Sequence, residues 1–195
     1  VFVQSNINQF GALAMAGCGS YSKIEGFGFI PVTCFSQALT TFIGQNLGAK
    51  EYDRAKKGAL FGTVCGIGIA EVIGIAVFFF SPYLIAAFGG DQKAIEYGIA
   101  EAHTITLFYC LLAFSHCMAA IQRGAGRSIV PMFVMMIVWC GVRVTYISIV
   151  IRIIPVINVI YWAYPLTWFI SSVIFLILFL KTDWIHGLEK QGQGA

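Results

Sequence analysis

Long apolar runs separated by short polar segments make up most of the chain, and each run is long enough for a membrane-spanning helix. About 20 mainly apolar residues, at 1.5 Å per residue, cross the hydrocarbon core of a bilayer, which is about 30 Å thick. The runs are continuous and lack the alternation typical of barrel strands. We therefore expect an all-α, polytopic membrane protein with a six-transmembrane-helix bundle. The predicted spans are 1–22, 26–47, 58–80, 97–121, 129–151 and 159–180.

These spans predict one transmembrane domain over residues 1–183 and a polar tail over residues 184–195. The third span is expected to end at Ser81-Pro82, because proline interrupts a helix. The chain begins at Val1 inside an apolar run with no basic segment before it, so we expect the first helix to be truncated and no signal peptide to be present. The loops are short, so function has to be carried out within the membrane.

Composition supports this class and excludes others. Apolar residues make up 58% of the chain and charged residues 11%, with a mean hydropathy of +0.82, whereas a soluble domain carries about 25% charged residues. The lipid bilayer is thus the first expected partner. The net charge is +3 with no long Lys/Arg run, which excludes a nucleic-acid footprint. Six cysteines lie in apolar stretches without metal-ligand spacing, so we expect no metal site and no disulfide framework.

The basic residues predict an orientation. If the loop after the second span is cytoplasmic, eight basic residues lie on the cytoplasmic side and three on the other, with Arg143 inside the fifth span. We therefore expect a multi-pass protein of the cytoplasmic membrane with a cytoplasmic C-terminus. The eight are Lys50, Arg54, Lys56, Lys57, Arg123, Arg127, Lys181 and Lys190, and the three are Lys23, Lys93 and Arg152.

The second span carries a polar stripe. Thr33, Gln37, Thr41 and Gly44 recur at i+3 and i+4 spacing and share one helical face. Such a stripe faces a partner helix or a wet cavity, because it cannot face lipid without a large free-energy cost. Gly44 also forms a GxxxG pair with Gly48, a spacing that lets a neighbouring helix approach closely.

The segment from Gln4 to Lys57 resembles the start of the C-terminal half of multidrug and toxic compound extrusion (MATE) transporters. The most specific motif is Gly44-Gln45-Asn46-Leu47-Gly48-Ala49-Lys50 followed by Arg54-Ala55. Other matching positions are Gln4, Ile7-Asn8, Phe10-Gly11, Ala14, Ala16, Lys23-Ile24-Glu25 and Pro31, with looser agreement at 122–127, Arg143 and Trp168.

The resemblance implies a twelve-helix transporter of two six-helix lobes, in which this chain supplies helices seven to twelve. The missing N-terminal lobe of the same polypeptide is then a partner. Family members export organic cations and other amphipathic compounds in exchange for Na⁺ or H⁺ and need no cofactor. In the family topology the GQNLGAK motif and the C-terminus are cytoplasmic, as the basic residues also predict.

Four ionisable residues inside predicted spans are candidates for ion coupling or gating, because charge in hydrocarbon is costly unless it is paired or hydrated. Glu71 lies near the expected midplane and either carries an ion or holds helices together. Arg143 is also deep and is interpreted first as an ion-pair partner. Glu101 is expected in the outer turns of the fourth span, with His103, and His116 about 10 Å from the opposite end of that span.

Some family members bind the coupling ion with a carboxylate in the seventh or tenth helix. The first predicted span here offers Gln4 and Asn8 but no acid. These two residues are four apart, so they share a helical face, and together with Thr33, Gln37 and Thr41 they are the candidates for lining a substrate cavity. The acid is then expected in the missing lobe.

Two other functions remain open at this point. A lipid-linked oligosaccharide or polysaccharide flippase of the same superfamily would need a strongly cationic cavity, yet Arg143 is the one deep basic residue. A membrane-embedded enzyme would need a catalytic constellation such as a Ser–His pair, and no such spacing is present in the sequence. The sequence therefore favours an efflux transporter and not an enzyme.

Overall fold

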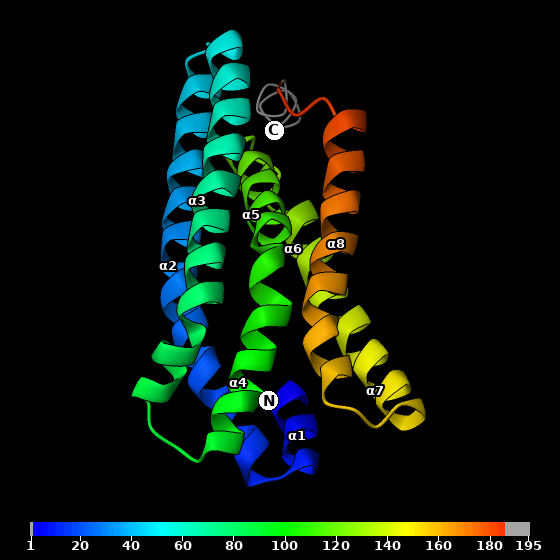
Figure 1. Ribbon diagram of the computed structural model, residues 1–195. Helices are drawn as coiled ribbons and strands as arrows, with labels where there is room; N and C mark the ends of the chain where they lie inside the picture. The colour runs from blue at the N-terminus through cyan, green and yellow to red at the C-terminus, as the bar shows by residue number, and fades with distance from the viewer. Residues whose placement is uncertain (1, 186–195) are drawn as a thin grey trace.

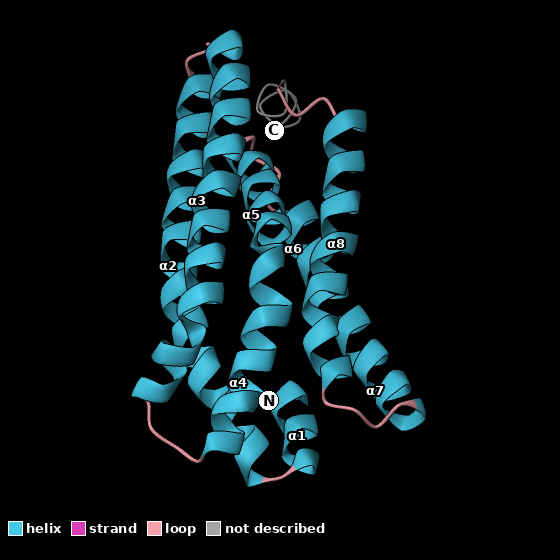
Figure 2. Ribbon diagram, in the orientation of Figure 1, coloured by secondary structure: helices cyan, strands magenta, loops and turns pink. Residues whose placement is uncertain are grey.

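The computed structural model describes residues 2–185, which form helices and loops and no strand (Figure 2). The predicted all-α membrane bundle is confirmed. The helices are α1 (Phe2–Ile7), the 3₁₀ turn η1 (Asn8–Phe10), α2 (Ala12–Gly48), α3 (Tyr52–Ala87), α4 (Gln92–Ile105), the 3₁₀ turn η2 (Thr106–Phe108), α5 (Tyr109–Gly124), α6 (Ile129–Met135), the π-helix η3 (Met136–Val142), α7 (Arg143–Ile153) and α8 (Asn158–Lys181). Most of the predicted tail lies outside the described residues.

Five helical segments of the described chain are long and apolar enough to cross a membrane: 12–48, 52–87, 92–124, 129–153 and 158–181. The α2–α3 turn, the α5–α6 turn and the end of α8 lie at one end of the bundle, and the α3–α4 and α7–α8 connections lie at the other (Figure 1). The alternation of ends is the one that the basic residues require. We call the end that holds the α2–α3 turn, the α5–α6 turn and the end of α8 the basic end.

The boundary between the first two predicted spans is wrong. The chain breaks at Gly11, where φ is +98°, a value that glycine adopts without strain. From Ala12 one helix then runs without interruption to Gly48. Lys23 and Glu25 were expected in a loop, but both are good helix formers, and the single Gly26 beside them does not end a helix. Residues 2–10 therefore form the short α1 and η1, and residues 12–48 form one helix long enough to cross a membrane.

The third span also continues past its predicted end, because α3 includes Pro82. Proline lacks the N–H that would bond the carbonyl of Phe78, four residues earlier. Two other groups contact this oxygen: the Ser81 hydroxyl donates to it at 3.0 Å, and Nε2 of His103 lies 3.1 Å from it. A proline is tolerated in a membrane helix when neighbours satisfy the freed carbonyl. The ring of His103 also stacks on Phe78.

Glycines allow the closest helix contacts. A Cβ on Gly17 of α2 would collide with the Ala94 carbonyl of α4, and a Cβ on Gly98 would lie 2.8 Å from the Gly17 oxygen. The backbones of α2 and α4 therefore touch directly. On α3, three glycines spaced four residues apart lie against side chains of α2 and α5. They are Gly58, Gly62 and Gly66.

Candidate functional site

One face of α2 carries polar groups toward the interior of the bundle, with Cys18 and Tyr21 buried and Glu25 half-buried. Cys18, Tyr21 and Glu25 follow the i, i+3, i+7 spacing of a single helical face. The Cys18 sulfur lies 3.5 Å from the Tyr161 hydroxyl of α8, and the Tyr21 hydroxyl lies 3.3 Å from that of Tyr109 on α5. The face thus joins helices that are far apart in the sequence.

Glu101 of α4 lies next to this face. It was expected in the outer turns of the fourth span, and the structure shows that its side chain is only 3% exposed. Its Oε2 is buried and has no hydrogen-bond partner among the described residues. Cys18 and Glu25 are among the groups that interact with its carboxylate. Tyr161 extends the polar contacts by donating to the carbonyl of Tyr97 at 3.3 Å.

Arg143 closes the site from the other side. It begins α7 directly after the π-helical η3, a local widening that is frequent at functional sites. Its Nη2 and Nε donate to the Thr167 hydroxyl of α8 at 2.7 and 3.3 Å. The guanidinium carbon lies 4.2 Å from the centre of the Tyr164 ring and 5.7 Å from that of Trp139. Its charge acts on Glu25 across the site.

We call Glu25, Glu101 and Arg143 the charged cluster. Counted from the end opposite the basic end, Glu101 is about 14 Å along α4 and Arg143 about 15 Å along α7 at 1.5 Å per residue. Both are thus near the middle of a core of about 30 Å. Glu25 interacts with both Glu101 and Arg143, and two carboxylates with one guanidinium leave one negative charge in excess, so the cluster is neutral when it holds one additional proton or one monovalent cation. Buried charges are stable only when they are compensated.

The other two ion-coupling candidates make different contacts. Oε2 of Glu71 accepts the backbone N–H of Cys110 at 3.0 Å. The 3₁₀ turn η2 interrupts the helix just before this N–H, so Glu71 joins α3 to the α4–α5 junction. The ring of His116 lies between Phe29 and Trp139, and its Nε2 is buried without a hydrogen-bond partner in the described part of the chain.

Most of the substrate-cavity candidates are exposed side chains. Gln4 and Asn8 are exposed on α1 and η1, and Gln37 and Thr41 are exposed on α2. Thr33 is half-buried, and its hydroxyl donates to backbone carbonyls of its own helix. No described residue of this chain covers the exposed positions. That these residues line a substrate cavity stays a prediction.

The GQNLGAK motif forms the tight turn between α2 and α3. Asn46 is buried; its amide donates to the Phe42 carbonyl at 2.7 Å, and its own carbonyl accepts the N–H of Glu51 at 2.8 Å. The left-handed residue of the turn is Lys50, with φ +61°. Of the GxxxG pair, Gly44 packs against the Gly124 carbonyl, whereas nothing lies within 4 Å of a Cβ at Gly48. Gln45 and Ala49 are exposed, as is Pro31.

Sequence reasoning did not identify Glu25 as a site residue. It was assigned to a loop because Lys23, Glu25 and Gly26 interrupt the apolar pattern. The spacing from Cys18 and Tyr21 is the signal that would have found it, since those three residues share a face once the helix is continuous.

The fold and the charged cluster define a polytopic α-helical membrane protein with ionisable groups in its interior, the arrangement that marks ion and substrate pathways in such proteins. The family follows from the sequence comparison. The MatE family model matches residues 1–149, and the chain belongs to this family.

Curated relatives agree with this assignment. "Probable multidrug resistance protein NorM" of Thermotoga maritima is 29% identical over 130 residues, which cover 66% of this chain and 28% of that protein. "Probable multidrug resistance protein YoeA" of Bacillus subtilis is 26% identical over 145 residues, covering 74% and 31%. The matched segments thus span about a third of these relatives' own lengths. Neither match favours the flippase alternative.

Solved structures share the fold. A MATE transporter in a bent conformation superimposes with a TM-score of 0.84 at 17% identity, covering 93% of this chain and 40% of that one. The MATE transporter ClbM, solved in complex with Rb⁺, gives a TM-score of 0.85 at 16% identity, with 94% and 44% covered. At these identities the likeness establishes the fold of a MATE transporter lobe.

Proposed function

We propose that this chain is one six-helix lobe, residues 1–183, of an antiporter of the cytoplasmic membrane. The antiporter exports small organic cations in exchange for Na⁺ or H⁺, and the charged cluster binds the coupling ion. The single observation that carries the coupling proposal is the buried, unpartnered Oε2 of Glu101 beside Glu25, with Arg143 as the one cation of the cluster. Relatives that are named multidrug resistance proteins support the export of drugs.

The charge balance explains how the cluster couples to transport. An excess of one carboxyl group favours uptake of a proton or a monovalent cation, because the empty cluster holds an uncompensated charge in low dielectric. Glu25, Glu101 and Arg143 come from three different helices, so uptake of the ion changes the attraction among α2, α4 and α7. In this mechanism, rocking of this lobe against its partner lobe alternates access to the cavity.

Efflux of a cationic dye from proteoliposomes tests the coupling proposal in the complete two-lobe polypeptide. Glu101→Gln removes the titratable carboxyl while keeping its size, and we expect at least a tenfold loss of efflux driven by an imposed Na⁺ or H⁺ gradient. Glu96→Gln is the matched control, since Glu96 is exposed on the same helix. Gradient-driven efflux that survives Glu101→Gln at the wild-type rate would remove Glu101 from the coupling site.

The second part of the proposal concerns the substrate cavity. In a two-lobe transporter the polar positions Gln4, Asn8, Thr33, Gln37 and Thr41 line the space between the lobes. Gln37→Leu is then expected to change the dye concentration at half-maximal efflux while leaving the ion dependence unchanged. The control is Ala38→Leu, at the neighbouring exposed position. Equal effects of the two variants would argue against a cavity role for Gln37.

The basic end is proposed to face the cytoplasm. A cysteine introduced in place of Lys50 in the α2–α3 turn is then protected from a membrane-impermeant thiol reagent in intact cells and labelled after permeabilisation. Labelling in intact cells would reverse the orientation. The measurement is made in a variant whose exposed native cysteines, Cys34 and Cys140, are replaced by serine.

A further inference from the structure

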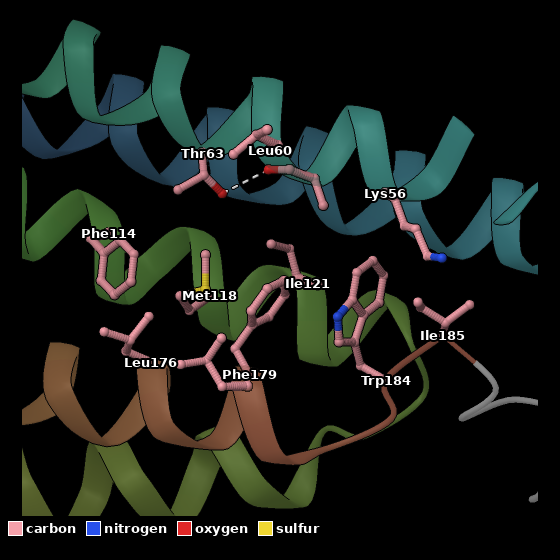
Figure 3. Close-up of a pocket in the computed structure, with 12 residues that line it drawn as sticks. Lys56, Leu60, Thr63, Phe114, Met118, Ile121, Leu176, Phe179, Trp184 and Ile185 are labelled. Atoms are coloured by element: carbon pink, nitrogen blue, oxygen red, sulfur yellow. Dashed lines mark hydrogen bonds between the residues drawn. The ribbon is translucent and has the colours of Figure 1, made fainter. Parts of the chain in front are cut away.

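A groove of about 510 Å³ opens between α3, α5 and α8 at the basic end of the bundle. Its walls are almost wholly apolar and come from all three helices: Leu60 on α3, Phe114 and Met118 on α5, and Leu176 and Phe179 on α8. Figure 3 shows these side chains pointing toward one another across the groove. The groove is separate from the charged cluster, because no residue of the cluster lines it.

The two ends of the groove differ in polarity. Figure 3 shows Lys56, Trp184 and Ile185 at one end and Phe114 and Leu176 at the other. The Thr63 hydroxyl, in the wall between them, already donates to the Ala59 carbonyl at 2.8 Å. The groove thus offers one cationic group at its mouth and no unused hydroxyl along its wall. An occupant that fits it has an anionic head and an apolar tail.

The mouth of the groove is held in place by the segment after α8. Nη2 of Arg127 donates to the Asp183 carbonyl at 2.9 Å, which fixes this segment against the α5–α6 turn. Trp184 follows directly, is 5% exposed and stacks on Phe179 with ring centres 5.5 Å apart. A tryptophan and a lysine at the same level are typical of the membrane–water interface, where phospholipid headgroups lie.

We propose that this groove binds one anionic phospholipid from the adjacent leaflet, with an acyl chain between α3, α5 and α8 and the phosphate on Lys56. The apolar walls favour an acyl chain because each buried CH₂ group contributes to binding, so the site does not select one chain length. The ammonium of Lys56 favours an anionic headgroup over a zwitterionic one, because a basic residue at the membrane surface attracts anionic lipid. The proposal rests on the membrane location of the chain and is independent of its transport activity.

Native mass spectrometry of the complete polypeptide tests the headgroup. The protein is released from mixed vesicles of phosphatidylglycerol and phosphatidylcholine, and retained lipids are counted. We expect one retained phosphatidylglycerol in the wild type and about a fivefold loss of the preference for it in Lys56→Gln. Lys57→Gln is the matched control, because Lys57 is the next residue on α3 and does not line the groove. Equal losses in both variants would overturn the assignment to Lys56.

A second pair of variants tests the acyl-chain site. Leu176 and Ile177 are adjacent on α8 and are 45% and 46% exposed, but only Leu176 lines the groove. Leu176→Trp is expected to fill the groove and abolish lipid retention, whereas Ile177→Trp retains the lipid. Identical retention in the two variants would refute the groove as the binding place. Recovery of a cationic dye or a second copy of the protein in place of lipid would also overturn the proposal.

Fluorescence provides a measurement that needs one conservative substitution in the groove. Phosphatidylglycerol brominated on its acyl chains quenches tryptophan that lies near the bromine atoms. We expect stronger quenching by the brominated lipid in the wild type than in Trp184→Phe, which keeps an aromatic ring on Phe179. Quenching that is the same with and without Trp184 would contradict an acyl chain at this position.

Discussion

The direct contact between α2 and α4 gives the sharpest prediction about stability. A methyl group on Gly98 would lie 2.8 Å from the Gly17 oxygen, whereas contacts of 3.4 Å or more are ordinary, so the two helices would have to separate by about 0.6 Å. A methyl group on Gly17 would meet the Ala94 backbone more closely still. The obstacle in both cases is backbone, which has no alternative rotamer.

Overpacking of this kind costs about 1–3 kcal/mol, and more when backbone has to move. Gly17→Ala is therefore expected to lower the free energy of unfolding by at least about 3 kcal/mol. Gly19→Ala is the control: Gly19 is two residues away on the same helix, and nothing lies within 4 Å of its added methyl group. Because alanine is the better helix former, Gly19→Ala should be neutral or stabilising by up to about 1 kcal/mol.

The assay is the temperature at which the detergent-solubilised complete polypeptide loses its monodisperse peak in size-exclusion chromatography. Gly17→Ala and Gly98→Ala should both lower it by several degrees, and Gly19→Ala should leave it unchanged or raise it. If Gly17→Ala and Gly19→Ala lose the peak at the same temperature, the backbones of α2 and α4 do not touch. The geometry assigned to the charged cluster then loses its support.

Three further predictions follow from single contacts. Thr167→Val removes the acceptor of both Arg143 hydrogen bonds and should destabilise by about 2–3 kcal/mol in thermal unfolding, while Thr167→Ser should not. Glu71→Ala leaves the Cys110 N–H unpaired and should lower the free energy of unfolding by about 1–3 kcal/mol. Glu71→Gln keeps an acceptor and should preserve both stability and efflux. Loss of efflux in a stable Glu71→Gln variant would support Glu71 as an ion-coupling residue. Lys50→Gly relieves a left-handed backbone and should raise stability by up to about 1 kcal/mol, and a lower melting temperature would contradict this reading of the α2–α3 turn.

The class of fold could be predicted because it depends on long apolar runs, which leave little choice in a bilayer. Two element boundaries could not be predicted, for different reasons. Pro82 does not end α3, since Ser81 and His103 contact the carbonyl that it frees, and the position of His103 depends on the fold. Glu25 lies in a continuous helix because the charged residues and the single glycine that interrupt the apolar pattern do not end a helix.

The charged cluster shows the same limit. Arg143 was identified from its depth and from its agreement with the family pattern, and a deep arginine needs a partner wherever the fold places it. Glu101 was identified as a candidate, but its burial depends on the packing of α4 against α2, which no local pattern reveals. Its relation to Glu25 joins positions 76 residues apart in the sequence, and only the fold brings them together.

The contact of α2 with α4 lies near one end of a long helix, so a small tilt of α2 about this contact moves its other end by a large distance. Gly17 and Gly48 lie 31 residues apart on one uninterrupted helix, which corresponds to about 46 Å. A tilt of about 10° around Gly17 would carry the α2–α3 turn through about 8 Å, although side chains of the charged cluster near the pivot would move far less. A distance probe on this turn would therefore record a rearrangement of the lobe that is too small to see at the charged cluster itself.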